Sequence, residues 1–227
     1  MIKPLLTALP FTLFLLNATA GDSPMTYERI NLSVSTEQQV DNDTLVAVMS
    51  AQQEGNDPSS LAQEVNQRIQ QAVGRAKKNP AIRVQTLDYQ TSPIYRKQSL
   101  AGWRVRQSIR LESQESAALS KLIGVLQQEL GVDNISYAIS PQRRKESEDR
   151  LITQAIARFK QRAEMISTEI GHPGYRLVEM NVNTQGHTPR PMQVRAMAME
   201  AQAAAPTLEA GSQRVEVTIN GTIELKP

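Results

Sequence analysis

The chain contains 227 residues, of which 40% are apolar, a size that suits one large domain or two small ones. Its 25 basic and 23 acidic residues nearly balance, and only 4% are aromatic. A nucleic-acid binder concentrates basic charge on one face or adds aromatic stacking residues, so that class is not indicated. The absence of cysteine and the presence of only two histidines exclude disulfides, thiolate metal sites, a cysteine nucleophile and a three-histidine site within one chain.

Residues 1–20 have the pattern of a signal peptide. Lys3 precedes an apolar run over residues 5–16, and Ala18-Thr19-Ala20 resembles a small-x-small cleavage site. The alternative is a poorly anchored N-terminal helix. No later segment reaches the length of a membrane span, and no cysteine is present for a lipid anchor. We therefore expect a mature chain that begins near Gly21, is exported and resides in the periplasm of a Gram-negative cell.

The next part of the sequence predicts two strands and a helix. Apolar residues alternate with polar ones from residue 30 to residue 34, and a second apolar run covers residues 45–51. Because Asn42-Asp43 between them is typical of a turn, the two runs predict a hairpin. Asp57-Pro58 indicates the start of a long helix, since aspartate is a good N-cap and proline suits the first helical position. This helix is expected to end near Asn79-Pro80.

A second hairpin and a second helix are predicted after residue 80. We expect strands over residues 82–91 and 103–111, joined by a turn or long loop over residues 93–102. The second of these strands places Trp103, Val105, Gln107, Ile109 and Leu111 on one side and Arg104, Arg106 and Arg110 on the other. A helix over residues 114–130 is expected to end at a left-handed Gly131, before a short strand over residues 135–139.

The last part of the sequence predicts the longest helix and two more strands. Ser140-Pro141 opens this helix and Gly171 closes it. Strands are expected over residues 177–182 and 215–225, separated by a mobile loop rich in Met, Ala and Pro over residues 186–211. The predicted fold is α+β, with two antiparallel hairpins and long helices packed on the sheets, in the order ββαββαβαβ-loop-β.

These features resemble the SIMPL-domain family over roughly residues 25–226. Val84-Gln85-Thr86 and Pro93-Ile94-Tyr95 resemble the family's strand and turn motif, and Gly102-Trp103-Arg104-Val105 resembles the opening of its next strand. The long helix keeps the eight-residue spacing of Ala155, Ala163 and Gly171, although Phe159 stands where a small residue is usual. The resemblance implies one SIMPL-like domain over residues 21–227.

The resemblance also implies a kind of function. Members of the family are exported or periplasmic, some are linked to oxidative-stress defence, some are surface antigens, and at least one forms a large ring-like oligomer. No catalytic residue or cofactor is established for the family, so none is transferred to this chain.

Two groups of side chains are candidates for binding. Arg104, Arg106 and Arg110 form a row that could hold an anion or an acidic partner strand, or could be a solvent face that pairs with carboxylates. His187, Met192, Met197 and Met199 offer soft ligands for Cu(I) or oxidisable thioethers, or the methionines could cover an apolar groove or a neighbouring subunit.

No catalytic motif is present. The sequence lacks a nucleophile elbow, a metalloprotease helix motif and a Walker loop. His172 is expected to cap a helix end. The carboxylates of Glu146, Glu148 and Asp149 are expected to be solvated neighbours of basic residues on the same helix.

We therefore expect a non-enzymatic protein without a cofactor that acts by non-covalent interaction. Its partners are expected to be other copies of the same chain, and an envelope protein is a further candidate, because a long projecting helix and strand edges suit self-assembly. The expected role is tolerance of envelope or oxidative stress. A soft-metal or oxidant-binding module that uses the methionine segment, and a hydrolase with unpredicted carboxylates, remain the alternatives.

Overall fold

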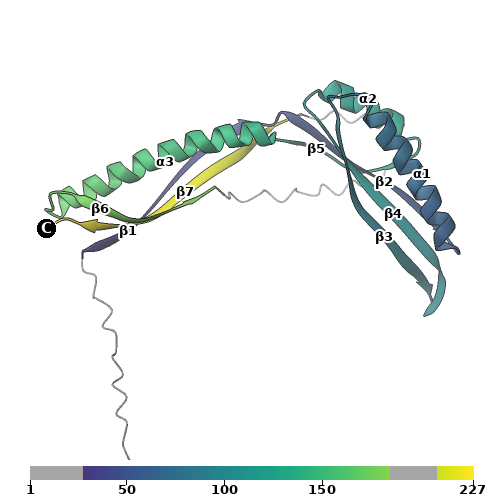
Figure 1. The fold of residues 1–227 in the computed structure, drawn as a ribbon, viewed down its shortest axis with the longest axis horizontal. Coiled ribbons are helices and arrows are strands. Elements are labelled where there is room, and N and C mark those ends of the chain that lie inside the picture. The colour runs from purple at the N-terminus through teal and green to yellow at the C-terminus, as the bar shows by residue number, and fades with distance from the viewer. Residues whose placement is uncertain (1–27, 185–208) are drawn as a thin grey trace, which may run out of the picture.

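The computed structural model of the protein describes residues 28–184 and 209–227 (Figure 1). The described part of the chain folds into three helices and seven strands, an α+β fold that confirms the predicted class. The elements are, in chain order, β1 (Arg29–Asp41), β2 (Thr44–Gly55), α1 (Pro58–Ala76), β3 (Arg83–Arg96), β4 (Ser99–Ser113), α2 (Ser116–Leu126), β5 (Gly131–Ala138), α3 (Pro141–Glu169), β6 (Tyr175–Asn183) and β7 (Ser212–Leu225).

The strands form two separate antiparallel sheets, each with its own hydrophobic core. We call the sheet β1-β7-β6 with α3 the three-stranded half, and the sheet β3-β4-β2-β5 with α1 and α2 the four-stranded half. The two halves meet end to end, at the start of α3 and the start of β2 (Figure 1). The four-stranded half is continuous in sequence from β2 to β5, whereas the three-stranded half combines β1 with the C-terminal elements.

In the three-stranded half, α3 lies over β1 and β7 and has few contacts with β6. Phe159 is the largest fully buried side chain of this core, and its ring lies directly above Gly221 of β7. A Cβ atom at Gly221 would lie 2.8 Å from the Phe159 ring and 2.8 Å from the Glu179 carbonyl oxygen. The missing side chain at Gly221 therefore provides the space for this large aromatic ring.

The predicted starts of α1 and α3 are confirmed. Asp57 accepts hydrogen bonds from the backbone N–H groups of Ser59 and Ser60 at the start of α1, and Ser140 accepts one from Arg143 at the start of α3. Both caps satisfy amides that have no partner within the helix. Gly171 has a φ of 86° after the end of α3, as the sequence predicts.

The first predicted hairpin is wrong. β1 pairs with β7 along its whole length, and β2 pairs with β4 and β5 in the other sheet. Asn42 donates its backbone N–H to the Gly211 carbonyl, and Asp43 donates its own to the Ala138 carbonyl. At Asn42-Asp43 the chain therefore passes from one sheet into the other instead of reversing.

Two further local predictions need correction. The strands β3 and β4 continue through the expected loop at residues 93–102 and are joined by a two-residue turn at Lys97 and Gln98, which have φ values of 49° and 68°. Gly131 is not a left-handed cap, since α2 ends at Leu126 and Gly131 pairs with Ser50 as the first residue of β5. The predicted pairing of β3 with β4 is confirmed.

Candidate functional site

The junction between the two halves is built around the carboxylate of Asp43. Ser140 donates to it through its backbone N–H at 2.6 Å and through its hydroxyl at 2.7 Å, and Thr44 donates its hydroxyl at 3.1 Å. Burial raises the pKa of Asp43, but the hydrogen bonds from Ser140 and Thr44 outweigh it and hold this pKa below its usual value. The ionised carboxylate therefore links the β1–β2 crossing to the start of α3.

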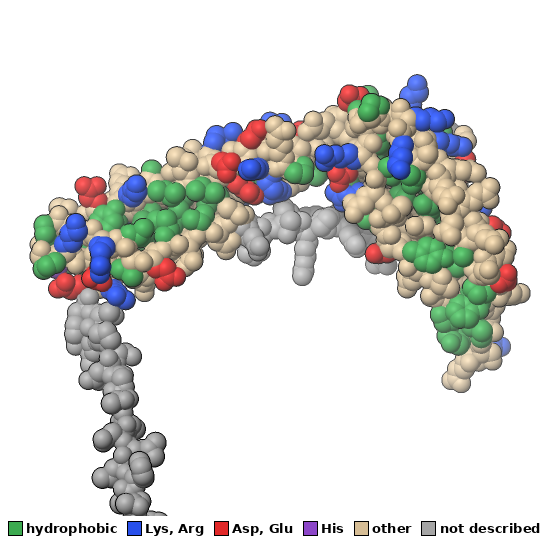
Figure 2. Space-filling model, in the orientation of Figure 1, with side chains coloured by type: hydrophobic (Ala, Val, Ile, Leu, Met, Phe, Trp, Pro, Cys, Tyr) green, Lys and Arg blue, Asp and Glu red, His purple; other side chains and the backbone are tan. Residues whose placement is uncertain are grey.

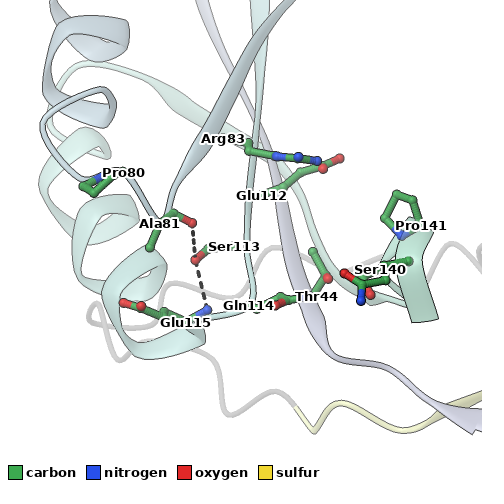
Figure 3. A pocket seen from close by; sticks show the side chains of 11 residues that line it. Thr44, Pro80, Ala81, Arg83, Glu112, Ser113, Gln114, Glu115, Ser140 and Pro141 are labelled. Atoms are coloured by element: carbon green, nitrogen blue, oxygen red, sulfur yellow. Dashed lines mark hydrogen bonds between the residues drawn. The ribbon is translucent and has the colours of Figure 1, made fainter. Parts of the chain in front are cut away.

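A cavity of about 540 Å³ opens beside this junction (Figure 3). Its lining comes from four segments: the start of β2, the loop before β3 with the first residue of that strand, the end of β4 with the turn into α2, and the start of α3. Ser113 donates its hydroxyl to the Ala81 carbonyl and accepts a hydrogen bond from the Glu115 N–H (Figure 3). Because its hydroxyl is held by backbone groups, Ser113 serves to join the loop before β3 to the start of α2.

The charges at this cavity have both signs. Arg83 and Glu112 face it from neighbouring strands, and Glu115 lies at the start of α2 (Figure 3). Among the described residues, no three histidine or acidic side chains come close enough together to hold a metal ion. The cavity combines a cation with two carboxylates and does not select an anion by charge.

The structure brings the three predicted arginines together on one face of β4, each beside a carboxylate. Arg104 pairs with Glu54 at 2.6 Å, Arg106 pairs with Asp133 at 2.7 Å, and Arg110 pairs with Glu112. Glu54 lies on β2 and Asp133 on β5, so the partners come from different strands of the sheet. This arrangement matches the carboxylate-paired face, one of the two interpretations of the row.

The second predicted group lies outside the described residues. His187, Met192, Met197 and Met199 all fall within residues 185–208, as does most of the expected loop over residues 186–211. The expected signal peptide at residues 1–20 also lies outside the described part of the chain.

The remaining candidates have local roles. The Nδ1 atom of His172 lies 2.8 Å from the Lys226 carbonyl oxygen, and the His172 backbone N–H donates to the Ser167 carbonyl, so this residue joins the end of α3 to the C-terminal strand. On α3, Glu146 accepts a hydrogen bond from Gln142 one turn before it.

Sequence reasoning missed an exposed apolar surface on the three-stranded half. On the edge strand β6, the exposed fractions are 47% for Leu177, 41% for Val178 and 44% for Val182. Leu177 and Val182 lie opposite the buried Ile223 and Ile219 of β7, so both face the side of the sheet that carries α3. Figure 2 shows hydrophobic side chains gathered over this half. The available signal was the apolar content of β6, because the single helix α3 is too narrow to cover all three strands of this sheet.

A second missed surface lies at the end of the β3–β4 hairpin. Tyr95 and Leu100 are a cross-strand pair, with exposed fractions of 64% and 54%. Arg96 and Lys97 follow Tyr95 at the turn, and both are exposed. The available signal was the apolar content of residues 93–102, which is unusual for a loop.

None of the described helices is long and apolar enough to cross a membrane. No curated protein matches the chain. A family model described as SIMPL, protein of unknown function (DUF541), matches residues 30–223, from the beginning of β1 to the end of β7. Because this match includes both halves and most of the sequence, the chain belongs to the SIMPL family.

Proposed function

We propose that the protein is an exported, periplasmic and non-enzymatic factor that self-associates and contributes to tolerance of envelope or oxidative stress. The observation that carries the self-association is the apolar side of β6 that α3 leaves uncovered. Export rests on the signal-peptide pattern of residues 1–20, and the stress role rests on the resemblance to other SIMPL proteins.

The uncovered surface follows from the position of α3. Arg158 and Arg162 donate hydrogen bonds to the carbonyls of Ser35 and Ser33, both in β1. This places one flank of the helix over β1. At 3.6 residues per turn, the partly buried Ile156 lies on the opposite flank, which faces β6. An apolar surface therefore runs from α3 to the edge strand.

An edge strand with exposed apolar side chains is a ready template for pairing with another chain. The strand β6 has a bulge in which Val178 is the extra residue. In an antiparallel pairing of two β6 strands centred on Met180, with Val178 left unpaired, Leu177 of one copy lies opposite Val182 of the other, and Glu179 lies opposite Asn181. Arg176 then lies opposite Asn183, so no two like charges face each other directly. Such a contact is isologous, because both copies use the same surface.

The bulge at Val178 is the feature that opposes this pairing, because bulges commonly protect edge strands. Here the extra residue is itself apolar and exposed. The bulge also allows Leu177 and Met180 to face the same side of the sheet, since they lie opposite Ile223 and Gly221. It therefore keeps Leu177, Met180 and Val182 on one surface.

The test is the solution mass of the mature chain by light scattering after gel filtration. We expect a discrete oligomer for the wild type and a single chain for the double variant Leu177→Lys and Val182→Lys. The control is Val125→Lys, which places a lysine at a similarly exposed apolar residue of α2 and leaves the oligomer intact. A wild type that stays a single chain throughout the micromolar range contradicts the proposed association.

The stress role has its own test. A strain that lacks the protein is complemented with the wild type, with Val125→Lys or with the double β6 variant, and its survival is measured under peroxide and under envelope stress. We expect the first two to restore survival and the third to fail. Unchanged survival of the deletion strain contradicts the stress role.

A further inference from the structure

The β3–β4 hairpin extends beyond the rest of its sheet. The pairing of β2 with β4 ends where Gly55 lies opposite Trp103, and the residues between Pro93 and Trp103 pair only with each other. Figure 1 shows this end of the hairpin projecting away from the other strands. We call residues 94–101 the hairpin tip.

The hairpin tip combines exposed apolar side chains with unpaired cations. Tyr95 and Leu100 form an exposed cross-strand pair that packs against neither core. In the described part of the chain, no carboxylate lies within ion-pair distance of Arg96 or Lys97. This separates them from Arg104, which is already neutralised by Glu54.

The sequence around the tip contains no acidic residue between Asp88 and Glu112. The tip therefore has a positive charge that is not balanced locally. The turn also places Lys97 and Gln98 at positive φ, where glycine or asparagine is usual. Residues with side chains rarely adopt this conformation, and such strain is found preferentially at functional sites.

We infer that the hairpin tip docks on an anionic lipid surface. Tyrosine is enriched at the boundary between lipid and water, where its ring is buried and its hydroxyl stays hydrated. Leu100 beside it adds apolar area to enter the headgroup layer, and Arg96 and Lys97 meet the lipid phosphates. This docking is peripheral and is independent of the self-association through β6.

The charge at the tip favours a lipid surface over contact between two tips. An isologous contact would bring Arg96 and Lys97 of both copies together, and like charges that face each other are costly. An anionic bilayer gains from both cations, at about 1 kcal/mol for each near the surface. The observations therefore favour lipid over a second copy at this site.

The experiment measures binding of the full mature chain to vesicles of phosphatidylglycerol with phosphatidylcholine, and to vesicles of phosphatidylcholine alone, by co-sedimentation. We expect binding only to the anionic vesicles, weakened by salt. The variant Arg96→Gln with Lys97→Gln is expected to bind about 30-fold more weakly. The variant Tyr95→Ser with Leu100→Ser is expected to weaken binding to the same anionic vesicles.

The matched control is Lys145→Gln with Lys160→Gln, which removes two exposed cations from α3 and is expected to keep binding within a few-fold of the wild type. Trp103, the only tryptophan, lies beside the tip, and its emission is expected to shift when anionic vesicles are added. Circular dichroism confirms that each variant is folded.

Three outcomes overturn the inference. The first is that the wild type does not bind anionic vesicles. The second is that the α3 control loses as much affinity as the tip variant, which would indicate general charge attraction. The third is that Tyr95→Ser with Leu100→Ser lowers the oligomer mass and leaves vesicle binding unchanged, which would make the tip a contact between copies.

Discussion

The Asp43 carboxylate receives two hydrogen bonds from Ser140, one from its backbone N–H at 2.6 Å and one from its hydroxyl at 2.7 Å. Asp43 lies at the crossing from β1 to β2, and Ser140 lies at the crossing from β5 to α3. These are the two places where the described chain passes between its halves. One side chain therefore holds both crossings together.

Asp43→Ala is expected to uncouple the two halves. The variant loses the two hydrogen bonds from Ser140 that join the halves, as well as the one from Thr44. Each hydrogen bond to a charged group contributes about 1.5–3 kcal/mol. We expect unfolding followed by Trp103 fluorescence, which reports on the four-stranded half, to separate from unfolding followed by far-UV circular dichroism. In the wild type the two transitions are expected to coincide.

Asp57→Ala is the matched control, because it removes a helix cap that lies wholly within the four-stranded half. It is expected to lower stability by about 1 kcal/mol and to leave the two transitions coincident. Coincident transitions in Asp43→Ala as well would show that Asp43 does not couple the halves.

The contribution of Asp43 is expected to depend on pH in the acid range. Its pKa in the folded protein lies below the unfolded value of about 3.9, so folding favours the ionised form. The stabilisation is complete above the unfolded pKa and is lost as the pH falls through the folded pKa. The difference in unfolding free energy between wild type and Asp43→Asn should therefore be constant near neutral pH and shrink below about pH 4. A difference that stays constant well below about pH 4 would contradict the assignment.

Gly221→Ala is expected to destabilise the three-stranded half by about 1–3 kcal/mol, because the new methyl group meets the Phe159 ring and the Glu179 carbonyl oxygen at 2.8 Å. In a Phe159→Leu background the cost should be smaller but still present, since the carbonyl oxygen remains. Denaturant unfolding of all four proteins gives the coupling energy. Gly74→Ala, whose Cβ would meet no atom within 4 Å beyond the nearby backbone of its own helix, is expected to stabilise α1 instead. Equal costs of Gly221→Ala in both backgrounds would rule out the contact with Phe159.

Gln98→Gly is expected to stabilise the β3–β4 hairpin by about 1 kcal/mol, because glycine adopts a positive φ without the steric penalty of a side chain. The midpoint of chemical denaturation measures the gain. Gln90→Gly, at an exposed position within β3, is the control and should lower stability. A Gln98→Gly variant that is less stable than the wild type would contradict the observed turn.

Local signals in the sequence predicted local structure well. Asp57-Pro58 and Ser140-Pro141 marked helix starts because a cap and a fixed proline φ act within one turn. The alternation in residues 215–225 correctly separated the two faces of β7, since side-chain direction depends only on position along the strand.

Strand partners were less predictable, because pairing depends on residues far apart in the sequence. The run before Asn42 pairs with β7 at the opposite end of the chain, and no local feature indicates this. The carboxylate partners of Arg104 and Arg106 lie on β2 and β5, so they were known only once the strand order was known. The exposure of Leu177 and Val182 depends on where α3 sits on the sheet.

The pairing of β1 with β7 has a consequence for how the protein forms during synthesis. Every strand of the four-stranded half lies before Ile139 in the chain, so this half can fold before the C-terminal strand is available. β1 is made first but must wait for the last strand of the chain before it has a partner. Until β7 arrives, the backbone groups along the edges of β1 stay unpaired and exposed. The protein is most open to aggregation, and to assistance from chaperones, during this interval.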